Sequence, residues 1–187
     1  MPAVHVAGLW RYPVKSLAGE ALPVAELTHD GLAGDRLVHV RDGTGPLTGR
    51  TRSGLLTQPA TTGTDGVPLV DGHRWDTATA LALVRERAGA GASLAAYDGP
   101  ERFDITNLLV ATDGAVAHLG HDVRRLRPNL LVGGVGPAEE ATWRGRALDR
   151  QRTGRNRLRT PALHRHQHRP RQTGLNVSLC LVLVGAR

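Results

Sequence analysis

The apolar runs of this chain are short, and turn residues end them within a few positions. Residues 4–9 partly alternate between apolar and polar side chains and stop before Pro13, because proline cannot donate to a strand ladder. Residues 22–27 form a second run of similar length. Short strands separated by frequent Gly, Asp and Pro turns are typical of a barrel or a compact mixed sheet.

Two β-hairpins are expected in the same half of the chain. Residues 36–41 alternate, and after an Asp-Gly pair the chain returns through residues 46–48. Residues 67–70 return through residues 73–75, again across Asp-Gly. Short turns of this composition between two runs favour antiparallel pairing of the flanking strands.

Helices are expected at only a few places, so the predicted fold class is mixed β with minor α. Residues 77–88 carry apolar side chains at helical spacing and are followed by a glycine. A second helix, over residues 112–119 with Thr112 as its N-cap, follows a strand at 108–111. We further expect a strand over 126–132, entered through an Arg-Pro-Asn corner, and a short helix over 137–143.

Charge is distributed unevenly along the 187 residues. Residues 1–149 hold 15 Lys and Arg against 17 Asp and Glu, whereas residues 150–187 hold nine Arg and no acidic residue. The formal net charge of +7 therefore comes from the tail. The tail has no helical or strand period apart from an apolar run over 175–184, which predicts one buried strand.

Neither a membrane span nor a signal peptide is expected. No apolar run reaches the roughly 20 residues that a bilayer-spanning helix needs, and the first residues lack a charged segment followed by an apolar block. The single cysteine, Cys180, excludes an internal disulfide and predicts a reducing cytoplasm. It lies in an apolar run, where a cysteine behaves as a small buried hydrophobe.

The only lysine of the chain, Lys15, belongs to the first candidate site motif, Tyr-Pro-Val-Lys-Ser. Pro13 ends a strand and fixes the following turn, which places the ammonium of Lys15 beside the hydroxyl of Ser16. An ammonium is a compact charge that suits a phosphate or another anion. An exposed turn lysine without a ligand is the alternative interpretation.

Arg36 belongs to the second candidate motif, Gly-Leu-Ala-Gly-Asp-Arg. Its two glycines bracket a tight turn, in which Asp35 can hold backbone amides while Arg36 reaches an anion. Arg50, after the first hairpin, would supply a further basic contact. Ordinary turn chemistry explains the same residues without a ligand.

A third candidate lies at residues 124–129, which read Arg-Arg-Leu-Arg-Pro-Asn. In a strand, Arg125 and Arg127 share one face, and Asn129 lies on the same side. Guanidinium and amide donors at the mouth of a strand predict an oxyanion clamp. A solvated run of charge is the alternative.

Two further patterns are weaker indications of a ligand site. The glycines at 133, 134 and 136 resemble a dinucleotide-binding loop, but the motif fails where Glu139 replaces its last glycine. His164, His166 and His168 have the spacing to bind Zn or Ni from one side of a strand. They lie among arginines in a region without pattern, so incidental composition is the better interpretation, and no metal ligand is assigned.

Taken in chain order, the motifs resemble one family. They run YPVKS, GLAGDR, LTGR, FDITNLLVATDGAV, RRLRPNLLVGG and AEEATWRGRAL, from residue 4 to about residue 149. The chain resembles MOSC-domain proteins with an N-terminal β-barrel extension, a group that includes the mitochondrial amidoxime-reducing components and the bacterial YcbX-type reductases. The resemblance implies a MOSC-type β-barrel fold with a barrel-like N-terminal domain over 1–98, an incomplete MOSC core over 99–149 and a basic, irregular tail over 150–187.

The resemblance also implies a ligand. MOSC-domain proteins of this group bind a molybdenum cofactor (molybdopterin), a pterin dithiolene that bears a phosphate. Residues that match the family's cofactor contacts come from four of these motifs, and they are Lys15, Ser16, Arg36, Thr112, Arg127 and Asn129. The resemblance assigns no catalytic residue.

The chain departs from the family pattern after residue 149. The family places a molybdenum-coordinating cysteine shortly after the segment that resembles TWRGRAL, yet residues 150–174 contain no cysteine and no acid. We therefore expect a change of reading frame near residues 146–150. A core without its closing strands is expected to expose apolar surface and to be poorly soluble.

Three functions remain open from the sequence. The first is an oxidoreductase that reduces small N-hydroxylated or N-oxygenated substrates with electrons from a partner protein. The second is a catalytically defective cofactor-binding or sulfur-carrier protein of molybdenum-cofactor metabolism. The third is nucleic-acid binding by the arginines of the tail, which is disfavoured because no aromatic residue lies among them to stack on bases.

Overall fold

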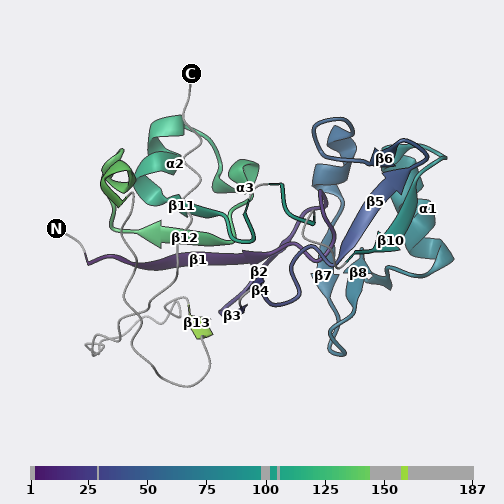
Figure 1. Ribbon diagram of the computed structural model, residues 1–187, viewed down its shortest axis with the longest axis horizontal. Coiled ribbons are helices and arrows are strands. Elements are labelled where there is room, and N and C mark those ends of the chain that lie inside the picture. Colours follow the sequence, from purple (N-terminus) through teal and green to yellow (C-terminus); the bar gives the residue numbers. More distant parts are fainter. Residues whose placement is uncertain (1–2, 29, 98–101, 105, 144–156, 160–187) are drawn as a thin grey trace. The chain divides into compact units, whose positions relative to one another are not determined.

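The computed structural model describes residues 3–28, 30–97, 102–104, 106–143 and 157–159 (Figure 1). Short strands are the most numerous elements in these ranges, and the helices are few and short. The predicted class, mixed β with minor α, is confirmed. Within the described ranges, no helix combines the length and the apolar character that crossing a membrane requires.

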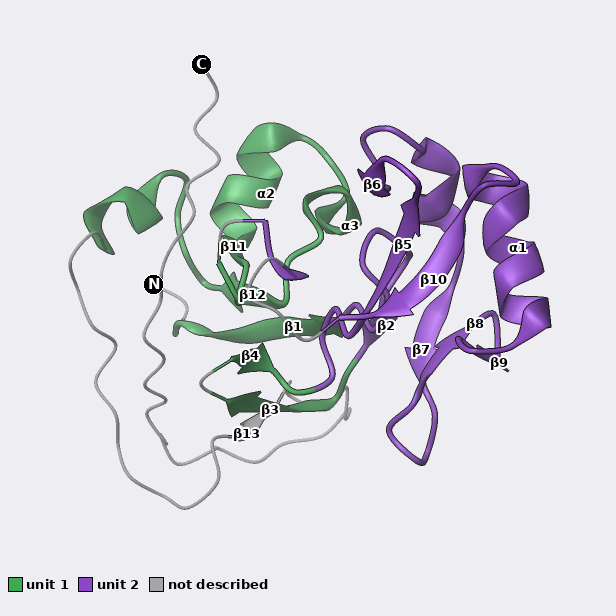
Figure 2. Cartoon of the chain, turned by 45° about the vertical axis from the view of Figure 1, so that its right-hand side comes forward, with its two compact units in different colours: residues 1–10, 22–33, 105–187 green, residues 11–21, 34–104 purple. Residues whose placement is uncertain are grey.

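The chain divides into two compact units, and segments that are separated in sequence make up each of them (Figure 2). Unit 1 consists of residues 1–10, 22–33 and 105–187, and unit 2 consists of residues 11–21 and 34–104. The three domains predicted along the sequence stay a prediction.

The first sheet of unit 2 has β5 (Val38–Asp42) between β6 (Gly45–Pro46) and β10 (Ser93–Ala96). Both pairings are antiparallel, with Arg41 opposite Pro46 in one and His39 opposite Ala95 in the other. The first predicted hairpin is confirmed. The partner on its other side, β10, was not predicted. Unit 2 also contains the short strand β2 (Glu20–Ala21).

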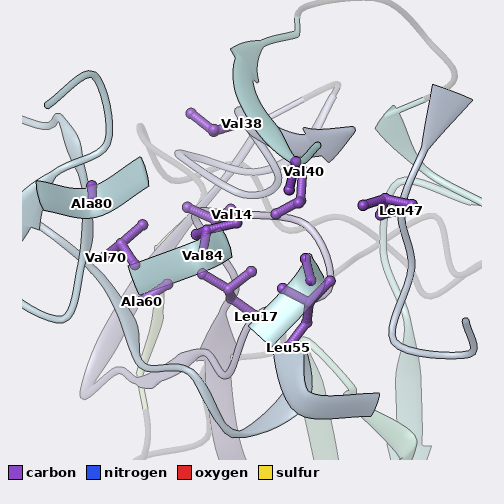
Figure 3. Close-up of a cluster of buried hydrophobic side chains, with 12 residues drawn as sticks. Val14, Leu17, Val38, Val40, Leu47, Leu55, Ala60, Val70, Ala80 and Val84 are labelled. Carbon is purple, nitrogen blue, oxygen red and sulfur yellow. The ribbon is translucent and has the colours of Figure 1, made fainter. Parts of the chain in front are cut away.

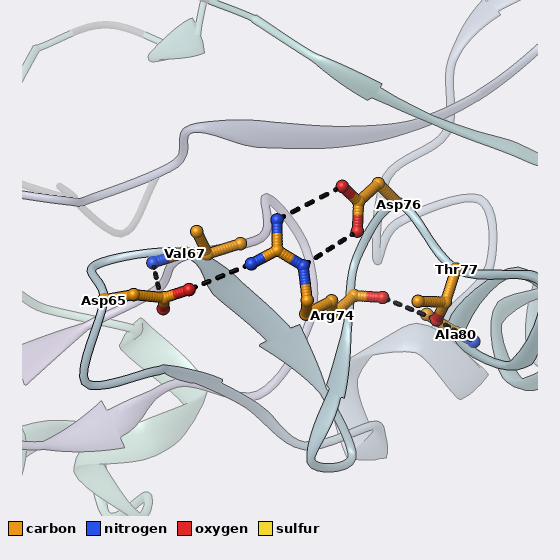
Figure 4. A network of polar contacts seen from close by, with 6 residues as sticks. All are labelled: Asp65, Val67, Arg74, Asp76, Thr77 and Ala80. Carbon is orange, nitrogen blue, oxygen red and sulfur yellow. Dashed lines mark hydrogen bonds and ion pairs between the residues drawn. The ribbon is translucent and has the colours of Figure 1, made fainter.

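The second sheet of unit 2 consists of β7 (Ala60–Thr62), β8 (Pro68–Val70) and β9 (His73–Arg74) in antiparallel order. The second predicted hairpin, β8–β9, is therefore confirmed. On its exposed side, the guanidinium of Arg74 binds Asp65 at 2.9 Å and Asp76 at 3.4 Å (Figure 4). The network joins the two ends of the hairpin to the start of the next helix.

That helix, α1 (Ala78–Ala88), confirms the prediction over 77–88. The hydroxyl oxygen of Thr77 accepts a hydrogen bond from the amide of Ala80 and caps the helix, which ends at Gly89. Its buried stripe of Ala80, Val84 and Ala88 packs onto the apolar core of the unit (Figure 3). The other members of this core are Val14, Leu17, Val38, Val40, Leu47, Leu55, Ala60, Val70 and Ala92. Leu55 belongs to a short 3-10 helix, η1 (Ser53–Thr57).

The main sheet of unit 1 has β12 (Leu130–Gly133) between β1 (His5–Arg11) and β11 (Val110–Thr112). β12 is antiparallel to β1, with Leu130 opposite Leu9, and parallel to β11, with Leu130 opposite Val110. These apolar residues form the centre of a second core together with Ala25, Leu27, Leu32 and Leu108. A smaller sheet in this unit has β3 (Val24–Thr28) between β4 (Gly31–Leu32) and β13 (Arg157–Arg159). β13 lies in the tail, for which no strand period was expected at these positions, so that prediction was wrong for residues 157–159.

The chain passes from β11 to β12 through two helices, α2 (Asp113–Leu119) and α3 (Val123–Leu126). Thr112 caps α2 and the helix ends at Gly120, as predicted, and Gly120 adopts a left-handed conformation. The expected strand over 126–132 was wrong at its start. Asp122 caps a helical turn, and Arg127 then adopts a left-handed conformation with φ of +53°, so the strand begins only at Leu130. The predicted helix over 137–143 is a 3-10 helix, η3 (Glu139–Trp143).

Candidate anion-binding site

The segment around Lys15 is held against β5 by backbone hydrogen bonds. The amide of Lys15 donates to the carbonyl of Val38 at 2.8 Å, and Val14 forms a parallel bridge with Val38. Val14 and Val38 are both part of the apolar core of unit 2. Because successive residues of a strand point to opposite sides, His39, the residue after Val38, lies on the face of β5 away from that core.

Ser16 follows with a positive φ of 71° and a buried side chain. For a residue other than glycine this backbone conformation is uncommon, and it turns the chain sharply after Lys15. The predicted turn is therefore present, with Lys15 only 12% exposed at its side chain rather than freely solvated.

The Asp35-Arg36 turn is tied to the same segment. The amide of Arg36 donates to the carbonyl of Tyr12 at 2.7 Å, and the carboxylate of Asp35 accepts from the amide of Tyr12 at 2.7 Å. Asp35 is buried and also pairs with the guanidinium of Arg36. Sequence reasoning expected Asp35 to hold backbone amides, and the amide that it holds belongs to Tyr12.

Aromatic rings flank the guanidinium of Arg36. Its central carbon lies 5.3 Å from the ring centre of Tyr12 and 5.8 Å from that of Phe103. Both distances are within the range of a cation–π interaction. Arg36 is therefore positioned by a carboxylate and two rings, and its side chain is largely shielded, with 14% exposed.

Asp104 is a carboxylate on which Lys15, Arg36 and Arg50 act together. Its Oδ1 lies 2.9 Å from the Nζ of Lys15. A hydrogen bond from Lys15 lowers the pKa of Asp104, and the charges of Lys15, Arg50 and Arg36 lower it further against the opposing effect of burial. We call Lys15, Arg36, Arg50 and Asp104 the anion site. Its three cations include every basic residue that sequence reasoning proposed within unit 2.

The other predicted contacts lie in unit 1. Asn129 is completely buried, its side-chain oxygen accepts from the amide of Leu109 at 3.2 Å, and its side-chain nitrogen donates to the carbonyl of Trp10 at 3.2 Å. The hydroxyl oxygen of Thr112 accepts from the amide of Ala115 as the helix cap, and the hydroxyl donates to Glu140. Arg127 follows α3 and does not share a strand face with Arg125, because neither residue is in a strand.

The glycine loop after β12 binds a carboxylate of the chain itself. The amides of Gly134 and Val135 donate to Asp113 at 2.7 and 3.0 Å, and the amide of Gly114 donates to it at 2.9 Å. Burial acts to raise the pKa of Asp113, but these backbone hydrogen bonds together lower it. The amides of Gly134 and Val135 in this loop thus serve the fold. No group of three or more potential metal ligands occurs among the described residues.

A family model for the MOSC N-terminal beta barrel domain matches residues 3–80. This stretch belongs to that family. The match confirms the resemblance to MOSC-domain proteins with an N-terminal barrel, a family that is generally associated with the molybdenum cofactor. The comparison with curated proteins gave no match. Lys15, Ser16 and Arg36 lie within the MOSC N-terminal domain, whereas Asp104 lies beyond the matched residues.

Two functional candidates were missed in the sequence. Asp104 stands in the motif FDITNLLVATDGAV, but nothing local shows that its carboxylate reaches Lys15. His39 interrupts the apolar run Val-His-Val, and it appeared only as one residue of an alternating strand. A polar residue between two core-facing valines is a usable signal, because it marks the opposite face of the strand. His164, His166, His168 and Cys180 lie outside the described residues.

Proposed function

We propose that this chain binds a molybdenum cofactor and that Lys15 and Arg36 hold the phosphate of its pterin. The family membership of residues 3–80 supports the cofactor class. The observation that carries the phosphate contact is the position of Asp104, an anionic group of the chain placed where Lys15, Arg36 and Arg50 all act on it. A phosphate offers more charge and more acceptor atoms to the same cations than one carboxylate does.

The residues of unit 2 fit the anionic end of such a cofactor. Lys15 and Arg36 are both mostly shielded from solvent, so their attraction for a phosphate is screened less than that of surface cations. Arg36 is also fixed by Asp35 and two rings, which lowers the entropy lost when it binds a ligand.

The metal end of the cofactor has no assigned ligand. Molybdenum of the expected kind takes a soft thiolate, and the only cysteine, Cys180, lies outside the motif that resembles the family. A bound cofactor would supply redox chemistry at its metal. The described residues would bind and orient it through the phosphate, and no proton transfer is assigned to any of them.

Within this class, we propose an oxidoreductase that reduces N-hydroxylated or N-oxygenated small molecules with electrons from a partner protein. The family resemblance supports this activity, and the single cysteine supports a reducing cytoplasm as its location. The second candidate is a cofactor-binding or carrier protein without turnover. The absence of a cysteine from residues 150–174 favours it, because the usual thiolate contact is missing there.

The cofactor is tested by expressing the full chain in a host that makes it. Molybdenum is measured by mass spectrometry and pterin by its fluorescent oxidation product, both per mole of chain. We expect Lys15→Gln and Arg36→Gln each to lower the pterin content about tenfold or more, since a charge-assisted hydrogen bond contributes roughly 1.5–3 kcal/mol. Arg74→Gln removes the same charge from the exposed hairpin network of unit 2 and should leave the pterin content unchanged.

The outcomes separate the candidates. Near-stoichiometric molybdenum with turnover of an N-hydroxylated amidine by a reduced dye supports the oxidoreductase and eliminates the carrier. Bound pterin without turnover supports the carrier. A wild-type chain without pterin, or an equal loss in Arg74→Gln and Lys15→Gln, refutes the phosphate contact proposed for the anion site.

A further inference from the structure

His39 is a deeply buried polar residue beside the anion site. It lies in the middle of β5, and only 4% of its surface is exposed. Its neighbours Val38 and Val40 face the apolar core, so the imidazole points to the other face of the strand. The ring of Tyr97 stacks on the imidazole with the ring centres 4.4 Å apart, and the backbone amide of Lys15 donates to the carbonyl of the adjacent Val38.

The Nε2 atom of His39 is buried and has no hydrogen-bond partner among the described residues. Leaving a buried polar atom unpaired costs about 1–3 kcal/mol, and native proteins contain few such atoms. The stacked ring of Tyr97 fixes the imidazole plane without satisfying this nitrogen. A group from outside the chain would satisfy it.

The imidazole is uncharged at neutral pH. Burial lowers the pKa of His39 to about 4, the charges of Lys15 and Arg41 contribute to the lowering, and Asp104 opposes it. These three charged groups act on His39 from its own strand, from the Lys15 segment and from the segment that ends at Asp104. Lys15 and Asp104 are members of the anion site, so the charged groups that act on the pKa of His39 include two residues of that site.

We propose that His39 is a ligand-contacting residue of the anion site, whose Nε2 forms a hydrogen bond with a polar atom of the ligand that Lys15 and Arg36 hold. This inference rests on the proposed function. A neutral imidazole can donate or accept through Nε2, depending on its tautomer. It therefore adds a directional contact beside the two cations, and it orients the ligand without adding charge.

The test titrates the full chain with a phosphorylated pterin and compares wild type with three variants. His39→Phe keeps a flat ring against Tyr97 and removes both nitrogens, His39→Gln keeps a polar group, and Lys15→Gln removes the cation. We expect His39→Phe to weaken binding roughly three- to tenfold, as the loss of one hydrogen bond predicts. His39→Gln should restore part of the affinity, and Lys15→Gln should weaken binding about tenfold or more. His39→Phe should unfold at no lower temperature than wild type, because it removes an unpaired polar atom.

The outcomes distinguish the two proposals. A wild-type chain that does not bind the pterin overturns the proposed function and the role of His39 with it. Binding that Lys15→Gln weakens but His39→Phe leaves unchanged overturns the His39 contact alone. If His39→Phe fails to fold, the contact is tested instead by the NMR resonances of the imidazole nitrogens in the wild-type chain. A shift of the Nε2 resonance when the pterin is added supports the contact, and an unchanged resonance overturns it. Inorganic phosphate, used as a second probe, shows whether the contacted atom belongs to the phosphate.

Discussion

The polar residues predicted as ligand contacts have different surroundings in the two units. In unit 2, Lys15 and Arg36 act on the carboxylate of Asp104, whose side chain is 67% exposed. In unit 1, the amide of Asn129 is fully buried and bonded at both ends to backbone groups of the unit. Lysine, arginine and asparagine side chains can all donate hydrogen bonds to an anion. In this structure, however, Lys15 and Arg36 act on an exposed carboxylate, whereas Asn129 bonds to backbone groups.

This difference shows how a framework residue is distinguished from a ligand-binding one. A fully buried side chain that satisfies two backbone groups cannot leave them without a large cost. A side chain paired with an exposed carboxylate can exchange that partner for a stronger anion at little cost. Asn129 therefore has an evident role in the fold, and its predicted contact with the cofactor stays a prediction.

Asn129→Ala should have the largest effect on stability. The substitution leaves the amide of Leu109 and the carbonyl of Trp10 without this partner and opens a small cavity. We expect a loss of about 2–4 kcal/mol in the free energy of unfolding, measured by denaturant titration. Lys15→Gln, in the same assay, should lose less than about 1 kcal/mol. Equal losses in the two variants would remove the distinction between the units.

Thr112→Ala should have an intermediate effect. The substitution removes the hydroxyl that caps α2 and that also bonds to Glu140. A lost N-cap costs about 1 kcal/mol, and the free energy of unfolding should fall by that amount. Thr112→Ser keeps the hydroxyl and serves as the matched control. If the serine variant were as unstable as the alanine variant, the buried methyl group and not the cap would be the important feature.

The elements that the sequence predicted correctly are those with local signals at both ends. Thr77 and Gly89 bound α1, and Thr112 and Gly120 bound α2. The hairpins followed from Asp-Gly pairs between two runs. The error at Arg127 arose because alternation was extended across a residue in the left-handed region, where a strand cannot continue.

The anion site was predictable only in part. Its cations could be named from the YPVKS, GDR and LTGR motifs, because each is a basic residue at a turn. Their common partner could not, because Asp104 reaches Lys15 across 89 positions of sequence and no pattern encodes that pairing. The surroundings of His39 could not be predicted either, because Tyr97 and the Lys15 segment, which lie against its strand, are distant from it in sequence.

Asp104→Asn should have the smallest effect on stability and an informative effect on binding. Removing the exposed carboxylate should change the free energy of unfolding by no more than about 0.5 kcal/mol, since surface ion pairs contribute little. Affinity for a phosphorylated pterin should rise a few-fold, because the ligand no longer displaces an internal anion. Asp122→Asn, which breaks a comparable exposed pair with Arg124 in unit 1, should leave the affinity unchanged.

The pH dependence of stability, compared between wild type and Asp104→Asn, sharpens this last test. The hydrogen bond from Lys15 lowers the pKa of Asp104 below its ordinary value of 3.8, so the folded state prefers the ionised carboxylate. The ionised carboxylate of Asp104 therefore contributes fully to stability above pH 3.8, and this contribution is lost as the pH falls through the lowered pKa. Denaturant titrations between neutral and acidic pH should show a smaller acid-induced loss in Asp104→Asn than in wild type. If Asp104→Asn instead bound the pterin more weakly, Asp104 would be a contact of the ligand and not its competitor, and the two units would differ less than their geometry indicates.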